Sequence, residues 1–199
     1  PWRAIEAPGW SAPADCVAAR VSMPGGAGLA YATAEQQDRY RLAATAKEKV
    51  PVVKRLLAKH QGEPTLVIGQ YLDQLADLAE ELQCPVITGE TKLKERQSLY
   101  DQFRHGDLPV LIVSKVANFS IDLPDASVAI QVSGSFGSRQ EEAQRLGRIL
   151  RPKSDGRTAH FYTIVVRDTV DAEFAANRQR FLAEQGYPYR ILDAEDLDS

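Results

Sequence analysis

The segment from residue 138 to residue 152 holds the densest group of side chains that could do chemistry, and it reads S-R-Q-E-E-A-Q-R-L-G-R-I-L-R-P. Ser138 and Glu141 form the S-x-x-E pattern of a capping box, so we expect a helix to begin there. Gln144, Arg148 and Arg151 follow at positions i, i+4 and i+7 and therefore share one face of that helix. Guanidinium groups pair with two phosphate oxygens at once, so this face could bind an anion that another body presents.

A second interpretation of the same face needs no ligand. The arginines could pair with Glu141 and Glu142 of their own helix and simply face solvent. Gly147 lies in the middle of the helix, where glycine costs about 1 kcal/mol relative to alanine. That cost indicates a close approach to the backbone there, but the residues alone leave both interpretations open.

The elements around this segment must position it, and from residue 65 onward apolar, strand-length runs alternate with amphipathic helices. The alternation predicts an α/β fold with a mostly parallel sheet flanked by helices on both faces. Ligands of such sheets bind beyond the carboxyl ends of the strands. The expected strands cover residues 17–23, 65–68, 85–87, 110–113, 127–132 and 159–166. The expected helices are two within 31–60, then 71–82, 91–105, 141–150 and a last one that Asp168 caps and Gly186 ends.

Two segments fall outside this alternation. Residues 24–28 read P-G-G-A-G, which is typical of a turn or a flexible loop. The tail, residues 193–199, is acidic, and we expect it to be frayed.

The sequence lacks the parts that hold a nucleotide without help. The pattern G-x-x-x-x-G-K-[ST] does not occur, and Gly26 and Gly28 do not complete G-x-G-x-x-G, because Tyr31 stands where the third glycine would be. No acidic pair follows an apolar strand, so no dedicated Mg²⁺ ligand is expected.

Composition excludes several classes of protein. The net charge is −3, so any contact with nucleic acid must use a local patch. Cys16 and Cys84 form no CxxC pair and the three histidines have no ligand spacing, so we expect no metal site and two reduced thiols in the cytoplasm. No apolar run approaches the roughly 18–20 residues that span a bilayer, so no membrane partner is expected.

Four patterns, in the order of the chain, make the sequence resemble the superfamily-two helicases. Q-x-x-G-R-x-x-R, over 144–151, matches their motif VI, and residues 113–122 align with motif V. Residues 67–70 look like motif IV, and residues 87–91 resemble the strand end that follows it. The fuller string from Ser120 to Pro152 resembles the XPB-type DNA repair helicases, particularly bacterial ones.

The resemblance implies the second of two RecA-like domains. In such helicases ATP and Mg²⁺ lie between the domains and are held mainly by the first, which this chain lacks. We divide the chain into an N-terminal segment with the first strand on the interdomain side (1–30), a helicase C-terminal RecA-like domain (31–166), and a C-terminal helix with an acidic tail (167–199). The start at Pro1, without methionine, suggests a piece excised from a longer protein.

The resemblance also assigns roles on the nucleotide side. Arg148 and Arg151 would be arginine fingers on the transferring phosphate, a role worth about 10³–10⁵ in turnover elsewhere. Gln144 would contact the γ-phosphate or position water, and Asp122 would approach the ribose or link the nucleotide to motif V. Without the motif, Asp122 would be interpreted as part of an Asx-type turn.

On the DNA side, Ser114 would donate its hydroxyl to a backbone phosphate, and Thr88 with the amides near Gly89 would grip a neighbouring one. Lys115 is a weaker candidate for the same task. Ser114 and Lys115, with Ser120, depart from the common T-D…G of motif V. Without the motifs, Ser114 would cap its own strand end and Thr88–Gly89 would be a turn.

The predicted function is the second motor domain of an ATP-dependent DNA helicase or translocase, inactive without the first domain. Its expected partners are that first domain and the backbone of DNA, bound without sequence preference. The alternative is a stand-alone RecA-like module that binds protein or DNA and hydrolyses no ATP.

Overall fold

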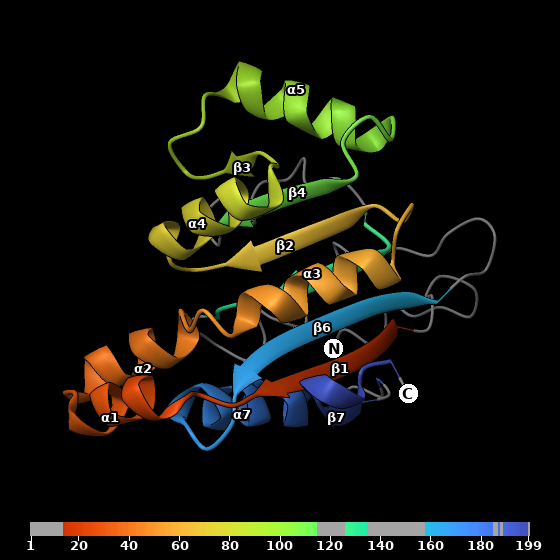
Figure 1. The fold of residues 1–199 in the computed structure, drawn as a ribbon. Helices are drawn as coiled ribbons and strands as arrows, with labels where there is room; N and C mark the ends of the chain where they lie inside the picture. The colour runs from red at the N-terminus through yellow and green to blue at the C-terminus, as the bar shows by residue number, and fades with distance from the viewer. Residues whose placement is uncertain (1–13, 115–125, 135–157, 185–186, 188, 199) are drawn as a thin grey trace.

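A computed structural model gives the fold and describes residues 14–114, 126–134, 158–184, 187 and 189–198. In this part of the chain seven parallel strands form one sheet, in the order β3-β4-β2-β5-β6-β1-β7 (Figure 1). The strands are β1 (Ala14–Val21), β2 (Thr65–Gly69), β3 (Val86–Ile87), β4 (Val110–Ser114), β5 (Val128–Gln131), β6 (Ala159–Val166) and β7 (Tyr189–Asp193). The helices are α1 (Gly25–Thr33), α2 (Gln36–Ala44), α3 (Lys49–Lys59), α4 (Leu72–Leu82), α5 (Leu93–Arg104), α7 (Val170–Glu184) and the short 3-10 turn η3 (Ala194–Asp196).

Helices cover both faces of this sheet, which confirms the predicted α/β architecture. Successive side chains of a strand point to opposite faces, so Val67 packs in one core while Leu66 and Ile68 pack in the other. The first core lies beneath α3, α4 and η3, and the second lies beneath α5 and α7. Because both faces are buried, the central strands are continuously apolar, which is the pattern that predicted them.

The amphipathic helices also follow their predicted stripes. On α4 the side chains of Leu75 and Leu78 are buried, and on α5 Tyr100 and Phe103 are. Gly106 follows α5 with a φ of +82°, a left-handed conformation that glycine adopts without strain, as its predicted place at a helix end requires.

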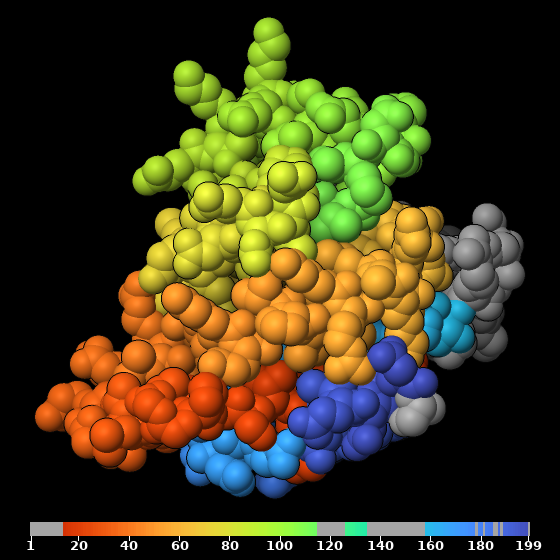
Figure 2. Space-filling model, viewed as in Figure 1, coloured from red at the N-terminus to blue at the C-terminus, as the bar shows by residue number. Residues whose placement is uncertain are grey.

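The prediction of a turn at residues 24–28 is wrong, because α1 begins at Gly25 and runs to Thr33. The two helices predicted within residues 31–60 are present as α2 and α3. No residue of α1 is buried, and α1 and α2 project at the lower left of the molecule in Figure 2. A tertiary contact holds this glycine-rich helix in place: the Tyr31 hydroxyl accepts a hydrogen bond of 2.9 Å from the amide of Val170. The guanidinium of Arg39 also lies 6.0 Å from the centre of the Tyr31 ring.

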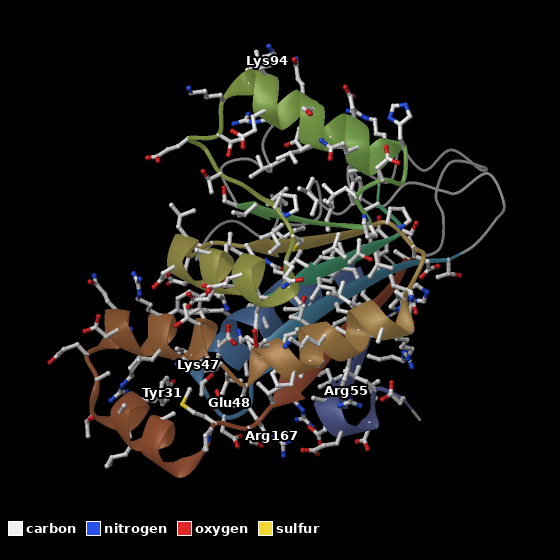
Figure 3. All side chains as sticks on the ribbon, turned by 45° about the horizontal axis from the view of Figure 1, so that its top comes forward. Tyr31, Lys47, Glu48, Arg55, Lys94 and Arg167 are labelled. Atoms are coloured by element: carbon white, nitrogen blue, oxygen red, sulfur yellow. The ribbon has the colours of Figure 1, made fainter. Side chains whose placement is uncertain are left out.

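The prediction of a frayed acidic tail is also wrong. β7 (Tyr189–Asp193) pairs with β1, and beyond it Ala194 and Leu197 are 7% and 4% exposed. Arg55, labelled in Figure 3, donates to the carbonyl of Ala194 at 2.7 Å, and Lys59 donates to that of Leu197 at 2.7 Å. Two cationic side chains of α3 thus hold the tail against the fold.

The last helix starts two residues later than its predicted cap. α7 begins at Val170, and Asp168 has a φ of +59°, which places it in the preceding turn. The hydroxyl of Thr169 donates to the carbonyl of Val166 at 2.8 Å and closes that turn instead.

Candidate functional site

The carboxyl ends of the parallel strands meet at one edge of the sheet, and this edge gathers the described candidate residues. Ser114 ends β4 and lies opposite Gly69, which ends β2. Thr88 follows β3, and Ser133 lies two residues beyond the end of β5. The parallel pairing of β3, β4, β2 and β5 thus brings their carboxyl ends to one edge of the sheet.

The segment after β3 forms a turn closed by its own side chains. The Thr91 hydroxyl accepts from the amide of Thr88 at 2.9 Å, and the Thr88 hydroxyl accepts from the amide of Glu90 at 3.3 Å. Arg96 of α5 donates to the Thr88 and Thr91 carbonyls at 3.3 and 3.4 Å. Gly89 is exposed at the tip. The turn predicted from the residue types is present, and its tip is open to a ligand.

Ser114 and Gly69 lie in a much more crowded place. Ser114 is 2% exposed. A Cβ atom at Gly69 would lie 2.6 Å from a methyl group of Leu75 and 3.0 Å from the Ser133 hydroxyl. That hydroxyl also accepts from the amide of Gln70 at 2.8 Å. The glycine thus allows the end of β2 to approach the end of β5 and the start of α4 closely.

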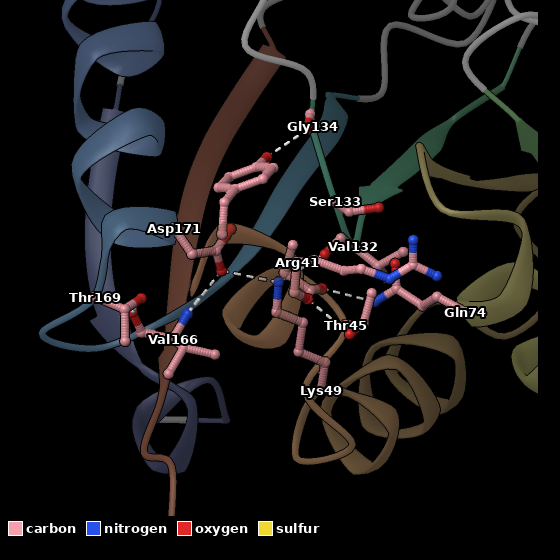
Figure 4. A network of polar contacts seen from close by, with 12 residues as sticks. Arg41, Thr45, Lys49, Gln74, Val132, Ser133, Gly134, Val166, Thr169 and Asp171 are labelled. Atoms are coloured by element: carbon pink, nitrogen blue, oxygen red, sulfur yellow. Dashed lines mark hydrogen bonds and ion pairs between the residues drawn. The ribbon is translucent and has the colours of Figure 1, made fainter. Parts of the chain in front are cut away.

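A buried ion pair lies beneath the end of β5, and the sequence analysis did not find it. The ammonium of Lys49 donates to Asp171 Oδ2 at 2.9 Å and to the Val132 carbonyl at 2.7 Å (Figure 4). The amide of Val166 donates to the same Asp171 oxygen at 2.9 Å. Both charged side chains are 2% exposed. The sequence does indicate that Lys49 is buried, because it shares the apolar face of α3 with Val52, Val53 and Leu56.

The side chain of Tyr40, next to this ion pair, holds Gly134, three residues beyond the end of β5. The Tyr40 hydroxyl donates to the carbonyl of Gly134, a contact drawn in Figure 4. The Tyr40 ring packs edge-on against Phe174 with a centroid distance of 5.1 Å, and its centroid lies 6.2 Å from that of Tyr71. Side chains of α2, α3 and α7 therefore meet at residues 132–134, directly after the end of β5.

Five predicted site residues lie outside the described residues: Gln144, Arg148, Arg151, Asp122 and Lys115. The direction in which the arginines point therefore stays a prediction. Of the residues predicted to contact the DNA backbone, Ser114, Thr88 and Gly89 belong to the described part of the chain.

The opposite edge of the sheet carries a separate group of titratable side chains. His60 bonds through one ring nitrogen to Glu63 and through the other to the Tyr162 hydroxyl, each at 2.6 Å. Burial and the nearby Asp15 raise the pKa of Tyr162 to about 12. Burial, with the neighbouring His60 second, lowers the pKa of His160. His160 lies near the amino end of β6, and Tyr162 lies in its middle, paired with Ile130 of β5. Neither is at the carboxyl ends where Ser114 and Thr88 lie, and we treat the group as part of the fold.

The helices of the described residues include none that combines the length and apolar character needed to cross a bilayer.

Comparison with solved structures identifies the fold. The C-terminal domain of the DEAD-box protein Dbp5 superposes with a TM-score of 0.70 at 16% identity, covering 94% of this chain and 93% of that one. The E. coli DEAD-box protein SrmB, solved with RraA, gives a TM-score of 0.62 at 18% identity, covering 92% and 91%. At such identities the likeness concerns the fold alone, which is RecA-like, as the sequence motifs implied.

Comparison with sequences identifies the family. Two relatives are named "DNA 3'-5' helicase XPB": that of Kineococcus radiotolerans is 67% identical over 198 residues, and that of Mycobacterium tuberculosis is 64% identical over 197. They cover 100% and 99% of this chain, which spans 36% of the length of each relative. The family model described as "ERCC3/RAD25/XPB C-terminal helicase" matches residues 5–198, and the chain therefore belongs to that family.

Proposed function

We propose that the full-length protein is an ATP-dependent DNA helicase that moves 3' to 5', and that this chain is its second motor lobe. The observation that carries the proposal is 67% identity, over the whole chain, to a relative named as a DNA 3'-5' helicase. The lack of any phosphate-binding glycine loop in this chain agrees with a lobe that acts on a nucleotide held elsewhere.

On the nucleotide side, Arg148 and Arg151 act as arginine fingers, Gln144 contacts the γ-phosphate or orients water, and Asp122 approaches the ribose. ATP with Mg²⁺, held mainly by the first lobe, supplies the phosphoryl group whose transfer drives the cycle. The position of these residues in the chain supports the assignment. Asp122 follows β4 and the other three follow β5, and ligands of parallel sheets bind beyond such carboxyl ends.

On the DNA side, Thr88 and the amides near Gly89 bind one phosphate, and Ser114 and Lys115 bind the next. Gly89 is exposed and the Thr88 turn is rigid, which supports a preformed cradle. Because Ser114 is 2% exposed, its hydroxyl reaches a phosphate only where the DNA strand lies directly against the end of β4. Contacts to phosphates carry no base sequence, so binding is independent of sequence.

The two sides together give a stepping motor. Attraction between the arginine fingers and the nucleotide phosphates closes the cleft, and hydrolysis removes that attraction. If each lobe holds phosphates of one strand, repeated closing and opening moves the protein along it. β1 precedes the predicted domain limit at residue 30, and α7 follows the limit at residue 166. We propose that both nevertheless belong to the same lobe as residues 31–166, because β1 pairs with β6 over eight residues.

The decisive experiment replaces an arginine finger in the full-length protein. Arg148→Ala is expected to lower ATP turnover by about 10³-fold or more while ATP binding is retained. The matched control is Arg104→Ala, which removes the same charge from an exposed position on α5. Turnover unchanged in Arg148→Ala, or an equal loss of ATP binding and of folded protein, would refute the assignment.

A second experiment separates the motor from a stand-alone binding module. The 199-residue chain alone should hydrolyse no ATP, because the phosphate-binding lobe is absent. In the full-length protein, Lys115→Ala should weaken binding to single strands of any sequence equally and reduce the salt slope by about one. Lys54→Ala, on α3, serves as the control for a lost exposed lysine. ATP turnover by the chain alone would favour a different enzyme.

A further inference from the structure

We propose that Tyr40, Lys49 and Ser133 are positioning residues that set the direction in which the chain leaves β5 toward the arginine fingers. For its activity readout the inference rests on the proposed function. Its structural readout does not, because that concerns only how firmly three consecutive residues, Val132 to Gly134, are held.

Side chains of two helices hold Val132 and Gly134, and Ser133 is held through its own hydroxyl. The Lys49 ammonium donates to the Val132 carbonyl at 2.7 Å, and the Tyr40 hydroxyl donates to the Gly134 carbonyl (Figure 4). Between them, the Ser133 hydroxyl accepts from the amide of Gln70 at 2.8 Å. α3, α2 and the end of β2 thus hold successive residues.

The groups that make these contacts are themselves held rigidly. Lys49, Tyr40 and Ser133 are 1%, 3% and 4% exposed. Lys49 is fixed by its ion pair with Asp171, and the Tyr40 ring is fixed by the edge-on contact with Phe174. A buried hydrogen-bond donor that cannot move holds its acceptor in one place, and the ammonium adds charge to the bond.

The held residues lead directly into the catalytic segment. Gly134 is followed by residues 135–157, which contain Gln144, Arg148 and Arg151. Val132 still donates to β2, through the Ile68 carbonyl at 2.9 Å, but the carbonyls of Val132 and Gly134 are bound by side chains. Catalytic groups must be held within about 0.5 Å of the productive geometry, so the direction of the chain at Gly134 affects how well the fingers meet a phosphate.

The test is Tyr40→Phe in the full-length protein, since phenylalanine keeps the ring contacts and removes only the hydroxyl. The matched control is Tyr162→Phe: Tyr162 is equally buried at 3% exposed, and its hydroxyl bonds at 2.6 Å to His60, which follows α3, and not to the segment from Val132 to Gly134. Both variants lose one buried hydroxyl contact, so a purely structural effect would be the same in both. Ser133→Ala is a second variant at the positioned segment.

We expect two results. In the nucleotide-free protein, amide hydrogen exchange in peptides that cover residues 132–134 becomes faster in Tyr40→Phe and Ser133→Ala but not in Tyr162→Phe. The kcat for ATP hydrolysis falls about fivefold in Tyr40→Phe, the equivalent of one neutral hydrogen bond, with KM for ATP within about twofold. Tyr162→Phe leaves kcat unchanged.

Equal hydrogen exchange in Tyr40→Phe and Tyr162→Phe would overturn the inference, whatever the activity. Unchanged kcat in Tyr40→Phe would also overturn it, provided that Arg148→Ala in the same preparation abolishes turnover. If Arg148→Ala is active, the proposed function has failed, and the exchange result then decides the positioning role by itself.

Discussion

Replacement of Lys49 by methionine tests the buried ion pair directly. The Lys49 and Asp171 side chains are 2% exposed and their charged atoms lie 2.9 Å apart. Methionine has a similar length and no charge, so Lys49→Met leaves the Asp171 carboxylate buried without its cation. It also removes the donor that binds the Val132 carbonyl at 2.7 Å.

The expected cost is large for one substitution. Removal of one partner of a buried ion pair costs about 3–5 kcal/mol, because the other charge stays in a poorly solvated place. Domains of this kind have a free energy of unfolding of about 5–15 kcal/mol, so a large part of the stability would be lost. The double variant Lys49→Met/Asp171→Leu should recover only part of it, since the Val166 amide and Val132 carbonyl then lose their partners.

Urea unfolding followed by circular dichroism measures these free energies. The matched control is Lys54→Met in the same helix, where Lys54 pairs with Glu81 at 3.1 Å but the two side chains are 49% and 54% exposed. Such a pair contributes about 0–1 kcal/mol. The reasoning would be refuted if Lys49→Met cost no more than Lys54→Met, or if the double variant were as unstable as the single one.

Three more predictions concern packing and titration. Gly69→Ala should lower the free energy of unfolding by about 1–3 kcal/mol, because its methyl group would lie 2.6 Å from a leucine methyl on α4. Gly28→Ala, which has nothing within 4 Å of the new methyl group, should raise it by up to about 1 kcal/mol by stabilising the exposed α1. Urea unfolding measures both changes. The pKa of His160 is lowered by burial and His60, so the unfolded chain binds the proton more tightly, and the free energy of unfolding should fall as the pH drops below about 6.5. His160→Gln should reduce that dependence between pH 7.5 and 5.5. Burial raises the pKa of Cys16 to about 12 and of Cys84 to about 11, so alkylation by iodoacetamide at pH 8, followed by mass spectrometry, should be slow at both and slower at Cys16.

Each of these three predictions would be contradicted by a specific result. A Gly69→Ala variant as stable as the parent would mean that the ends of β2 and β5 are not closely packed. Stability that rises on acidification, or a pH dependence that His160→Gln leaves intact, would contradict the burial of that imidazole. Alkylation of Cys16 as fast in the folded as in the urea-unfolded chain would contradict its position inside the sheet.

The central strands could be predicted from sequence because burial on both faces leaves a direct mark on composition. Residues 66–68 and 110–113 are continuously apolar and lie inside the sheet in β2 and β4. The same argument located Thr88 and Ser114 at one edge, since parallel strands align their carboxyl ends. Part of the candidate site therefore follows from the parallel topology alone.

Elements held by side chains from elsewhere could not be predicted in this way. α1 is rich in glycine and buries nothing, and its stability depends on contacts such as the bond from the Val170 amide to Tyr31. β7 (Tyr189–Asp193) is an edge strand with no fully buried residue, and it lacks the apolar run that marks a central strand. Lys49 was overlooked because a lysine on a helix is ordinarily solvated, although its alignment with Val52 and Leu56 indicated burial.

The place of β1 in the sheet has a consequence for biosynthesis. β1 precedes the other described strands in the chain, yet both of its hydrogen-bonded neighbours, β6 and β7, follow all the rest. A ribosome adds about 5–20 residues per second, so β1 spends several seconds outside the exit tunnel with neither neighbour made. During that interval the unpaired amide and carbonyl groups along both edges of β1 are exposed, and chaperones that shield nascent strands would act on this lobe chiefly before β6 and β7 emerge.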